Sequence, residues 1–567
     1  MISVPRELTE GIQQAWEKSW KIYTGQSGDE MQSESGKLPL CAIPVTVSSQ
    51  TSLRQLTLQA RSSFTILLLP STSLHENSLN ASSSLNTAHY HIPYPPGFHQ
   101  ITTSHCLQTS LYSDLSYPAH TAETMVISET PGGPPARPYT LAIVGGGIGG
   151  LCLAISLLHH NIPITIYEAA SQFAEIGAGV SLGPNAQRAM SLIDPRIKEG
   201  FDRCATNNAY PENRRFWFQF RLGQDRAGGM GTGMGTETGA GRATGTGTHV
   251  YDLECETGQT SVHRAHFLNE LEALIPEGVA VFGKRLEGYV DDGEGVTLRF
   301  KDGSSARHSA LIGCDGIKSR TRQLLLGEDD PAANPVFSGK YAYRGLVPMH
   351  EAAALLGDEL ARNSQLYMGH HGHLLTFPIE KGNTMNVVAF QAKRDGVWEG
   401  EWVQPMQKSD MRADFSGWVH AVQGIISLMR KPDVWALFEH LPAHRYWRGR
   451  VAVMGDAAHA TTPHQGAGAG MAIEDALVLG SALGLVWKAA DLPKAFEAFD
   501  AVQRPRSQRL VTTSHEGGML YEMELPGVEG DVEKIKDCLG SRMQWIWDVD
   551  LQANVKMVKA LVSETVS

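Results

Sequence analysis

The sequence has few of the features that mark disulfide-bonded, metal-bound or nucleic-acid-bound proteins. Its seven cysteines are scattered over 567 residues without a C-x-x-C pair, so neither a disulfide framework nor a structural zinc site is expected. The formal net charge is −12, and no block of Lys and Arg could follow a nucleic-acid backbone. We therefore expect a cytoplasmic protein with neither a metal nor a nucleic-acid partner.

Long apolar segments are also scarce. The first twenty residues contain acidic side chains and no apolar core, which argues against a secretory signal, and the apolar run 64–70 is too short to cross a bilayer. The stretch 141–158 has no charge, and its glycines fit both a membrane-helix pair and a nucleotide-binding turn. Glycines interrupt this stretch and another apolar strand follows directly, so we expect no transmembrane segment.

Two segments differ in composition from the rest of the chain. Residues 1–135, rich in Ser, Thr, His and Pro over much of their length, predict a low-order N-terminal extension. An alternative is that the natural protein starts at Met125. The Gly- and Thr-rich stretch 223–248 predicts a flexible surface loop.

The remaining sequence alternates strand and helix patterns, which is typical of an α/β fold. Residues 286–316 predict three short strands joined by glycine-bearing turns, and residues 371–391 predict a strand pair with a turn at Lys381. From Pro463 onward the pattern is helical, with helices expected over 466–487, 492–511 and 543–562.

A nucleotide-binding motif follows the first apolar strand, 141–144. Gly145 permits a tight turn, Gly147 lets the backbone approach a pyrophosphate, and Gly150 allows a helix to pack on the strand. The next predicted strand ends at Glu168, where an acid accepts hydrogen bonds from ribose hydroxyl groups. This motif predicts NAD or FAD and does not choose between them.

Two later stretches favour FAD. Asp315 and Gly316 follow one apolar strand, and Asp456 follows another, just before a glycine-rich helix start near 466–470. A carboxylate at the end of a strand can hold a ribityl hydroxyl, and free N–H groups at a helix start can stabilise negative charge on a reduced flavin. A simple NAD dehydrogenase does not need this second arrangement.

Taken in order, the glycine motif, "GCDGIKSRTR" (313–322) and "GDAAHATTPHQGAGAG" (455–470) resemble class A FAD-dependent aromatic monooxygenases, the group of para-hydroxybenzoate and salicylate hydroxylases. The stretches "EIGAGVSLGPNAQRAM" (175–190) and "GHLLTFPIEKGNTMNVVAF" (372–390) resemble fungal polyketide-tailoring members of this group. The resemblance implies a Rossmann-like FAD-binding domain of the glutathione-reductase type, a mixed β-sheet substrate domain and C-terminal helices. The expected ranges are 136–333 and 431–520 for the FAD-binding domain, 334–430 for the substrate domain and 521–567 for the last helices.

The resemblance also assigns roles to residues. Asp456 would hold the ribityl chain, Arg264 would reach the cofactor from a helix start, and Pro463 would lie beside the flavin ring. His459, His464 and Cys314 are expected to have structural roles. The residues expected to bind FAD are Gly145, Gly147, Gly150, Glu168, Arg264, Asp315, Gly316, Asp456, Gly466, Gly468 and Ala469.

The substrate site is predicted around "YAYRGL" (341–346), which resembles the Y-R-x-L segment of salicylate-hydroxylase-like members. Arg344 is the candidate to contact a substrate phenolate or carboxylate, with Tyr343 beside it; the alternative is an ion pair between Arg344 and a surface acid. Phe377 stands where close fungal members carry a tyrosine, and Tyr251 is a speculative replacement. No metal is expected at His370, His371 and His373, because alternate positions on a strand point to opposite faces.

The reaction implied by the resemblance uses NADH or NADPH to reduce FAD, which then reacts with O₂ and hydroxylates a small phenolic substrate through a flavin C4a-hydroperoxide. The favoured substrate is a phenolic aromatic polyketide, hydroxylated or dearomatised in secondary-metabolite biosynthesis. The alternative is salicylate 1-monooxygenase activity, with loss of CO₂. A non-catalytic flavoprotein and a flavin dehydrogenase or oxidase are further hypotheses. The nicotinamide cofactor and the oligomeric state stay open.

Overall fold

The computed structural model describes residues 135–173, 179–224, 245–393, 395–405, 408–430 and 433–565, together with two short strands near the start of the chain. The chain divides into two units, Met1–Glu123 and Thr124–Ser567. In the first unit, β1 (Val45–Thr46) and β2 (Thr57–Leu58) form an antiparallel pair. The predicted N-terminal extension otherwise lies outside the described residues, as does most of the predicted Gly/Thr loop (225–244).

A six-stranded sheet lies at the centre of the nucleotide-binding part. Its strand order is β10-β4-β3-β14-β22-β21, and every neighbouring pair is parallel except β21 with β22. Its central strands are short apolar runs because helices and other elements cover both of their faces. This arrangement confirms the expected Rossmann-like fold. The strands are β3 (Leu141–Val144), β4 (Ile164–Tyr167), β10 (Ala280–Val281), β14 (Ala310–Gly313), β21 (Trp447–Arg448) and β22 (Val451–Val453).

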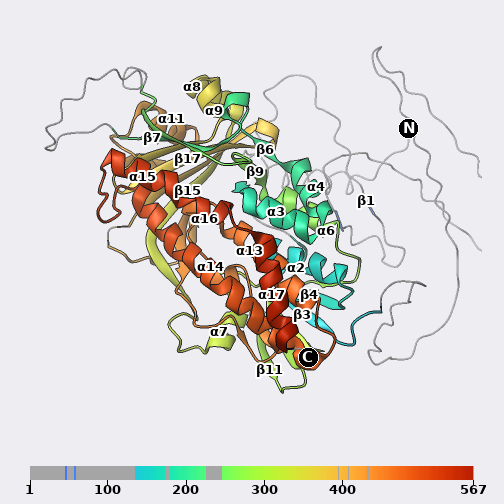
Figure 1. Cartoon of the computed structure of the whole chain (residues 1–567). Helices are drawn as coiled ribbons and strands as arrows, with labels where there is room; N and C mark the ends of the chain where they lie inside the picture. The colour runs from blue at the N-terminus through green and yellow to red at the C-terminus, as the bar shows by residue number, and fades with distance from the viewer. Residues whose placement is uncertain are drawn as a thin grey trace, which may run out of the picture. The chain divides into compact units, whose positions relative to one another are not determined.

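Four helices pack together beside this sheet (Figure 1). Helix α2 crosses from β3 to β4 and is buried along most of its length, as a crossover helix should be. It approaches α13 closely at Gly149, where an added Cβ would lie 3.2 Å from the Ala472 Cβ. The helices are α2 (Ile148–His159), α13 (Gly468–Leu483), α14 (Leu492–Tyr521) and α17 (Leu551–Thr565).

A second large sheet has eight strands in the order β19-β20-β15-β18-β17-β16-β7-β8. All neighbours are antiparallel except β16 and β7, which are parallel. The predicted range 334–430 is therefore too narrow, because this sheet also takes two strands from before residue 334 and one from after residue 430. The strands are β7 (Phe216–Leu222), β8 (Thr248–Glu254), β15 (Pro335–Pro348), β16 (Gln365–Gly369), β17 (Gly372–Ile379), β18 (Thr384–Ala392), β19 (Val403–Pro405) and β20 (Asp433–His440).

The two faces of the eight-stranded sheet have different neighbours. One face carries an apolar cluster shared with α8 (Met349–Leu356), α10 (Lys408–Asp414) and α11 (His420–Leu428). The other face packs partly against the end of α14 and against α15 (Val532–Arg542) and α16 (Gln544–Trp547). Figure 1 shows α8 and α11 on one side of β17, and α14 and α15 on the other. The second face is also the one that turns towards the cavity described below.

Several predicted elements differ in detail. The stretch 286–316 holds four strands, because the polar segment β13 (Ser305–His308) pairs with β12 (Val296–Phe300), itself paired with β11 (Leu286–Asp291). Helix α14 continues through Pro505 to Tyr521, α15 lies in the predicted C-terminal helical segment 521–567 although it was not predicted individually, and the last helix starts at Leu551. The predicted pair β17–β18 is confirmed. Among the described residues, no helix is both long enough and apolar enough to cross a bilayer.

The remaining described elements connect the strands and helices given above. A small antiparallel sheet, β5-β9-β6, leads directly into α6. These elements are β5 (Gly179–Ser181), α3 (Pro184–Ile193), α4 (Pro195–Cys204), β6 (Thr206–Asn207), β9 (Thr260–His263), α6 (Arg264–Glu272), α7 (Arg320–Leu326), α9 (Asp358–Arg362) and α12 (Asp456–His459).

Candidate active site

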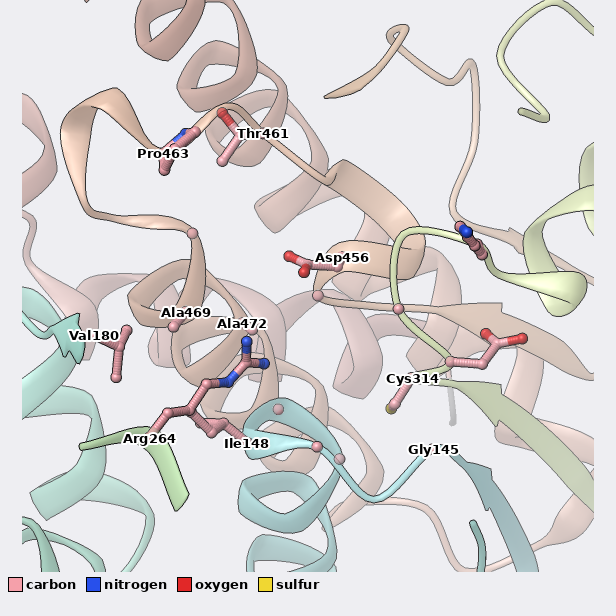
Figure 2. Close-up of a pocket in the computed structure, with 18 of the residues that line it drawn as sticks. Gly145, Ile148, Val180, Arg264, Cys314, Asp456, Thr461, Pro463, Ala469 and Ala472 are labelled. Carbon is pink, nitrogen blue, oxygen red and sulfur yellow. The ribbon is translucent and has the colours of Figure 1, made fainter. Parts of the chain in front are cut away.

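A cavity of about 930 Å³ is lined by residues from both large sheets and from the turns that follow β3, β14 and β22. Such a position, at the carboxyl ends of parallel strands, is where open α/β sheets bind their ligands. Every predicted site residue lines this cavity except Tyr343. Figure 2 shows Gly145, Arg264, Asp456, Pro463 and Ala469 around it.

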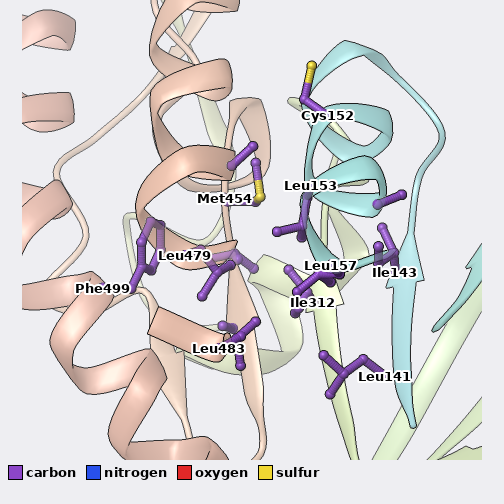
Figure 3. Close-up of a cluster of buried hydrophobic side chains, with 14 of the residues drawn as sticks. Leu141, Ile143, Cys152, Leu153, Leu157, Ile312, Met454, Leu479, Leu483 and Phe499 are labelled. Atoms are coloured by element: carbon purple, nitrogen blue, oxygen red, sulfur yellow. The ribbon is translucent and has the colours of Figure 1, made fainter. Parts of the chain in front are cut away.

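The cavity rests on the main apolar core. Met454 lines the cavity and also belongs to the core that holds β3, β14 and α2 together. Figure 3 shows Met454 near Leu153 and Leu479, from the facing helices α2 and α13. The glycine-rich turn is thus held by packed elements rather than by a free loop, which preorganises the backbone that meets a ligand.

The first turn of the site is too crowded for side chains. Gly145 has φ +106°, and a Cβ there would lie 2.2 Å from the Cys314 carbonyl oxygen. A Cβ on Gly150 would lie 2.2 Å from the Gly145 carbonyl oxygen. Helix α2 then starts after Gly147 with no side-chain cap and no acid in its first turn. Its first N–H groups lack intrahelical partners, so this end of the helix suits a pyrophosphate.

Glu168 follows β4 and is fixed by the backbone around it. One carboxylate oxygen accepts a hydrogen bond from the Gly146 N–H at 2.8 Å, and the other accepts from the Ala170 N–H at 2.7 Å. Each oxygen keeps a further acceptor site. The carboxylate lies on the cavity wall, where it can accept hydrogen bonds from ribose hydroxyl groups.

Asp315 follows β14, and protein donors engage both of its oxygens. One accepts from the Ser319 hydroxyl at 2.5 Å, and the other accepts from the N–H and hydroxyl of Thr321, both at 3.0 Å. Burial raises the pKa of Asp315, and these hydrogen bonds oppose that rise. Asp315 therefore shapes the turn at Gly316, which has φ +73° and lines the cavity.

Asp456 follows β22 at the start of α12, and its exposed carboxylate points into the cavity (Figure 2). None of the described side chains forms an ion pair with it within 4.0 Å. Beyond it, Pro463 and Gly466 line the cavity, and α13 starts after Ala467 with no side-chain cap and no acid in its first turn. An uncapped helix start and a free carboxylate are the two groups expected for a flavin ring and its ribityl chain.

His459 and Cys314, two of the residues expected to have structural roles, have different surroundings. The His459 Nε2 lies 2.5 Å from an oxygen of the buried Asp475, which also accepts from the Gly455 N–H at 2.8 Å. Burial lowers the pKa of His459 and the Asp475 carboxylate raises it, with a net rise. This pair fixes the turn before Asp456. Burial raises the pKa of the Cys314 thiol well above its usual value, which suits packing rather than redox chemistry.

Arg344 and Tyr343 lie on opposite faces of β15. The Arg344 guanidinium carbon lies 4.9 Å from the centre of the Trp435 ring, and both side chains line the cavity. Tyr343 is fully buried on the other face, where its hydroxyl donates to Asp414 at 2.6 Å. Tyr343, predicted beside Arg344 at the substrate site, therefore faces away from the cavity, because adjacent residues of a strand point to opposite sides.

Aromatic side chains form the walls next to Arg344. Trp217 and Phe218 come from β7, Phe377 from β17 and Phe390 from β18. Neither the β7 pair nor Phe390 was predicted, although the alternation in "FWFQFRL" could have indicated a strand there. Tyr251 packs in the apolar cluster near α15 and does not line the cavity, so it does not replace the missing tyrosine.

The three histidines near residue 371 do not alternate along one strand as expected. His370 and His371 lie in the turn between β16 and β17, where His371 has φ +64°, and only His373 lies on a strand. His371 Nδ1 pairs with Glu524 at 2.6 Å, and His373 Nδ1 pairs with Glu522 at 3.1 Å. The described part of the chain holds no group of three or more His, Cys, Asp and Glu side chains arranged for a metal.

Comparison with known proteins identifies the family of this chain. The FAD-binding domain family model matches residues 139–514. The chain is 44% identical over 421 residues to 6-methylsalicylate 1-monooxygenase atA of Aspergillus terreus, covering 73% of this chain and 90% of that protein. It is 39% identical over 428 residues to a salicylate hydroxylase of Pseudomonas putida, covering 73% and 93%. A solved salicylate hydroxylase substrate complex matches with a TM-score of 0.65 and 36% identity, covering 74% and 98%.

The family model and the relatives thus define this chain as an FAD-binding flavoprotein. The chain belongs to the FAD-dependent aromatic monooxygenases, together with the salicylate hydroxylases and their fungal relatives. Its expected fold class, cofactor and enzyme class are confirmed, and NAD(P)H and O₂ are the usual co-substrates of this family.

Proposed function

We propose that this enzyme hydroxylates a small phenolic carboxylic acid of the salicylate type, made by aromatic polyketide chemistry, at the carbon that carries the carboxylate. The observation that carries the proposal is Arg344, a cation in an aromatic cavity. None of the described acidic side chains lies within 4.0 Å of its guanidinium, and Asp433, opposite it on β20, is exposed.

The charge of Arg344 needs a partner from outside the protein. Burial and the nearby Arg264 lower the pKa of Arg344 to about 10, so it stays protonated at neutral pH. A partly buried charge without a counter-ion is costly, and a planar guanidinium binds a carboxylate through two parallel hydrogen bonds. A substrate carboxylate would supply the missing charge.

The shape of this end of the cavity suits one aromatic ring. Phe218, Phe377 and Phe390 present ring surfaces, and Leu375 and Val388 extend the apolar wall across neighbouring strands. Aromatic pairs favour edge-to-face or offset contacts, so these walls would orient a substrate ring while excluding water. The relatives named for 6-methylsalicylate and salicylate support a substrate that combines a ring, a phenol and a carboxylate.

The residues around the cavity would form two groups, one that binds the cofactor and one that binds the substrate. The turn at Gly145, the start of α2 and Glu168 fit the adenosine diphosphate half of FAD, and Asp456 and the start of α13 fit the flavin half. When bound, FAD supplies the electron transfer and the activation of O₂. Arg344 would hold the substrate carboxylate, the phenylalanine walls would fix the ring, and the His464 imidazole would face the phenol.

The test uses the FAD-loaded full chain with salicylate and 6-methylsalicylate, and with NADH and NADPH in parallel. We expect substrate-stimulated oxidation of one nicotinamide, release of CO₂, and a catechol that carries one oxygen atom from ¹⁸O₂. A hydroxylated or dearomatised product that keeps every carbon would favour the second candidate, a phenolic polyketide hydroxylase without decarboxylation. Labelled peroxide without labelled product would contradict both.

A further inference from the structure

Cationic side chains gather along one side of the cavity, where β11, β12 and α7 meet. Figure 1 shows α7 next to β11, and the Arg320 guanidinium joins them by donating to the Glu287 carbonyl oxygen at 3.0 Å. The Lys318 ammonium lies 4.1 Å from the centre of the Trp402 ring. A wall of positive charge attracts an anionic ligand. The cations that line the cavity here are Lys284, Arg285, Lys301, Lys318 and Arg320.

Two of these cations already have acidic partners in the protein. Lys284 forms an ion pair with Asp302 at 2.6 Å, and Arg320 forms one with Glu328 at 2.7 Å. Their charges are therefore balanced without a ligand. The question raised by the wall concerns the cations that have no such partner.

Arg285 and Lys301 lie opposite each other across two antiparallel strands. The register that pairs Leu286 with Phe300 places them face to face, and the Lys301 N–H donates to the Arg285 carbonyl oxygen at 2.9 Å. Both are exposed, and none of the described acidic side chains lies within 4.0 Å of either. Like charges directly opposite each other destabilise an antiparallel pair, so this arrangement needs a reason other than stability.

The pair lies at the end of the cavity that contains Glu168. The Lys284 N–H, next to Arg285 in the chain, donates to the Glu168 carbonyl oxygen at 2.8 Å. Glu168 fits the adenosine ribose of FAD, whereas Asp456, which fits the flavin half, lines the same cavity further on. A pyridine nucleotide with its nicotinamide at the flavin would therefore have its own adenosine near Arg285.

We propose that Arg285 and Lys301 form a phosphate subsite that binds the 2′-phosphate of NADPH, so that the enzyme prefers NADPH to NADH. This phosphate lies on the adenosine ribose and is the only group by which the two nucleotides differ. A guanidinium and an ammonium side by side would each donate hydrogen bonds to its oxygens. The bound anion would also remove the repulsion between the two cations.

The inference goes beyond the proposed function, because it concerns the electron donor and holds for any phenolic substrate. FAD has no phosphate for this pair, since its pyrophosphate fits the start of α2 and its ribose fits Glu168. The exposure of Arg285 and Lys301 places them on the rim of the cavity. They stay accessible to a nucleotide that arrives after FAD is bound.

The first experiment compares adenosine 2′,5′-bisphosphate with 5′-AMP, which lacks only the 2′-phosphate. Titration calorimetry on the FAD-loaded full chain should give a Kd about tenfold to 100-fold lower for the bisphosphate, as expected for hydrogen bonds to charged groups. Arg285→Gln and Lys301→Gln should each raise that Kd about tenfold and leave the Kd for 5′-AMP unchanged. FAD retention should be that of the wild type in both variants.

Steady-state kinetics give a second readout. In both single variants the KM for NADPH should rise about tenfold, while kcat and the KM for NADH stay at their wild-type values. The double variant Arg285→Glu with Lys301→Glu should prefer NADH, because two carboxylates repel the phosphate. The matched control is Arg299→Gln, which changes an exposed arginine of β12 outside the cavity and should match the wild type.

Several results would overturn the subsite. They are equal wild-type affinities for the bisphosphate and 5′-AMP, an equal loss of affinity in Arg299→Gln, and release of FAD from Arg285→Gln. A KM that rises equally for NADH and NADPH would also overturn it, because the pair would then bind the pyrophosphate.

The subsite and the proposed function can fail separately. If the wild type hydroxylates salicylate with a preference for NADH, the subsite is wrong and the proposed function stands. If NADPH binds through Arg285 and Lys301 but no salicylate-type acid is hydroxylated, the subsite stands and the proposed function is wrong.

Discussion

The Arg344 guanidinium lies over the indole of Trp435 on the neighbouring strand, 4.9 Å from the ring centre. This cation–π contact holds the charge in place without neutralising it. An ion pair with a surface acid, the alternative weighed for Arg344, would have used the same charge inside the protein. The contact instead leaves the guanidinium at the cavity wall, where the proposed function gives it a carboxylate partner.

Replacement of Arg344 should separate substrate binding from flavin binding. Arg344→Ala should lower kcat/KM for a salicylate-type acid about 100-fold, because a carboxylate loses a charged partner in an apolar site. The flavin absorbance spectrum should stay the same, and Arg344→Lys should recover part of the loss. Steady-state NAD(P)H oxidation measures the effect, and unchanged turnover in Arg344→Ala would refute the substrate assignment.

The adjacent residue offers a contrasting test. Tyr343→Phe should leave KM and kcat within about twofold of the wild type, since Tyr343 faces away from the cavity. It should reduce the free energy of unfolding by about 1 kcal/mol through loss of the hydrogen bond to Asp414. Kinetics and thermal melting on one sample measure both, and a large rise in KM would return Tyr343 to the substrate site.

Asp456 should matter for FAD and not for folding. Asp456→Ala should raise the Kd for FAD about tenfold, because its free carboxylate is the group available to the ribityl hydroxyls. Fluorescence of released FAD measures this change. Asp329→Ala is the matched control, since Asp329 is exposed outside the cavity. Equal FAD affinity in the two variants would show that Asp456 does not contact the cofactor.

Arg322 links three segments near α12. Its fully buried guanidinium donates to the carbonyl oxygens of Ala332 at 2.6 Å, Ala458 at 2.5 Å and Leu441 at 3.0 Å. Arg322→Met should lower the free energy of unfolding by about 3 kcal/mol, because buried carbonyls lose their donors.

The same change should loosen FAD, since Ala458 is two residues from Asp456. Thermal melting with and without added FAD measures both effects. The control is Arg412→Met, which changes an exposed arginine. A similar melting temperature for the two variants would contradict the linking role of Arg322.

His308 should make the protein less stable in mild acid. Burial lowers the pKa of His308 to about 4, while an unfolded histidine titrates near its usual value of 6.5. Between these values the unfolded chain binds more protons than the folded chain, so the contribution of His308 is complete above pH 6.5 and is lost as the pH falls towards about 4.

Thermal melting across this pH range measures the effect. His308→Gln can keep polar contacts to Tyr167 and Thr140 but does not titrate, so its melting temperature should depend less on pH. An unchanged dependence on pH would mean that other groups cause the acid sensitivity.

Much of the nucleotide-binding part could be predicted from local sequence. Gly145 and Gly150 have no room for a side chain, Glu168 comes directly after β4, and Asp456 comes three residues after the end of β22, so spacing alone indicated their places. The interior of α14 was harder, since Pro505 lies in the middle of a helix that continues to Tyr521. This helix packs against the main apolar core and against the apolar cluster on the second face of the eight-stranded sheet. That packing outweighs the tendency of Pro505 to end a helix.

The cavity walls near Arg344 could not be predicted in the same way, because they depend on pairings between distant segments. Trp217 and Phe218 reach the cavity only because β7 pairs with β16, about 150 residues later in the chain, and no local pattern encodes that pairing. The direction of the Tyr343 side chain could have been predicted from the sequence, because a residue next to Arg344 on a strand must face the other way. Glu522 follows an unpredicted helical turn, so its contact with His373 had no sequence signal.

The chain passes from one large sheet to the other several times, with β7 and β8 between β4 and β14, and β15 to β20 between β14 and β22. Neither sheet is therefore a continuous piece of the gene. A chimaera that exchanges substrate preference with a relative must transplant at least two separate fragments together. Exchange of 334–430 alone would leave the native Trp217 and Phe218 facing a foreign ring pocket, so laboratory recombination should succeed only where crossovers come in matched pairs.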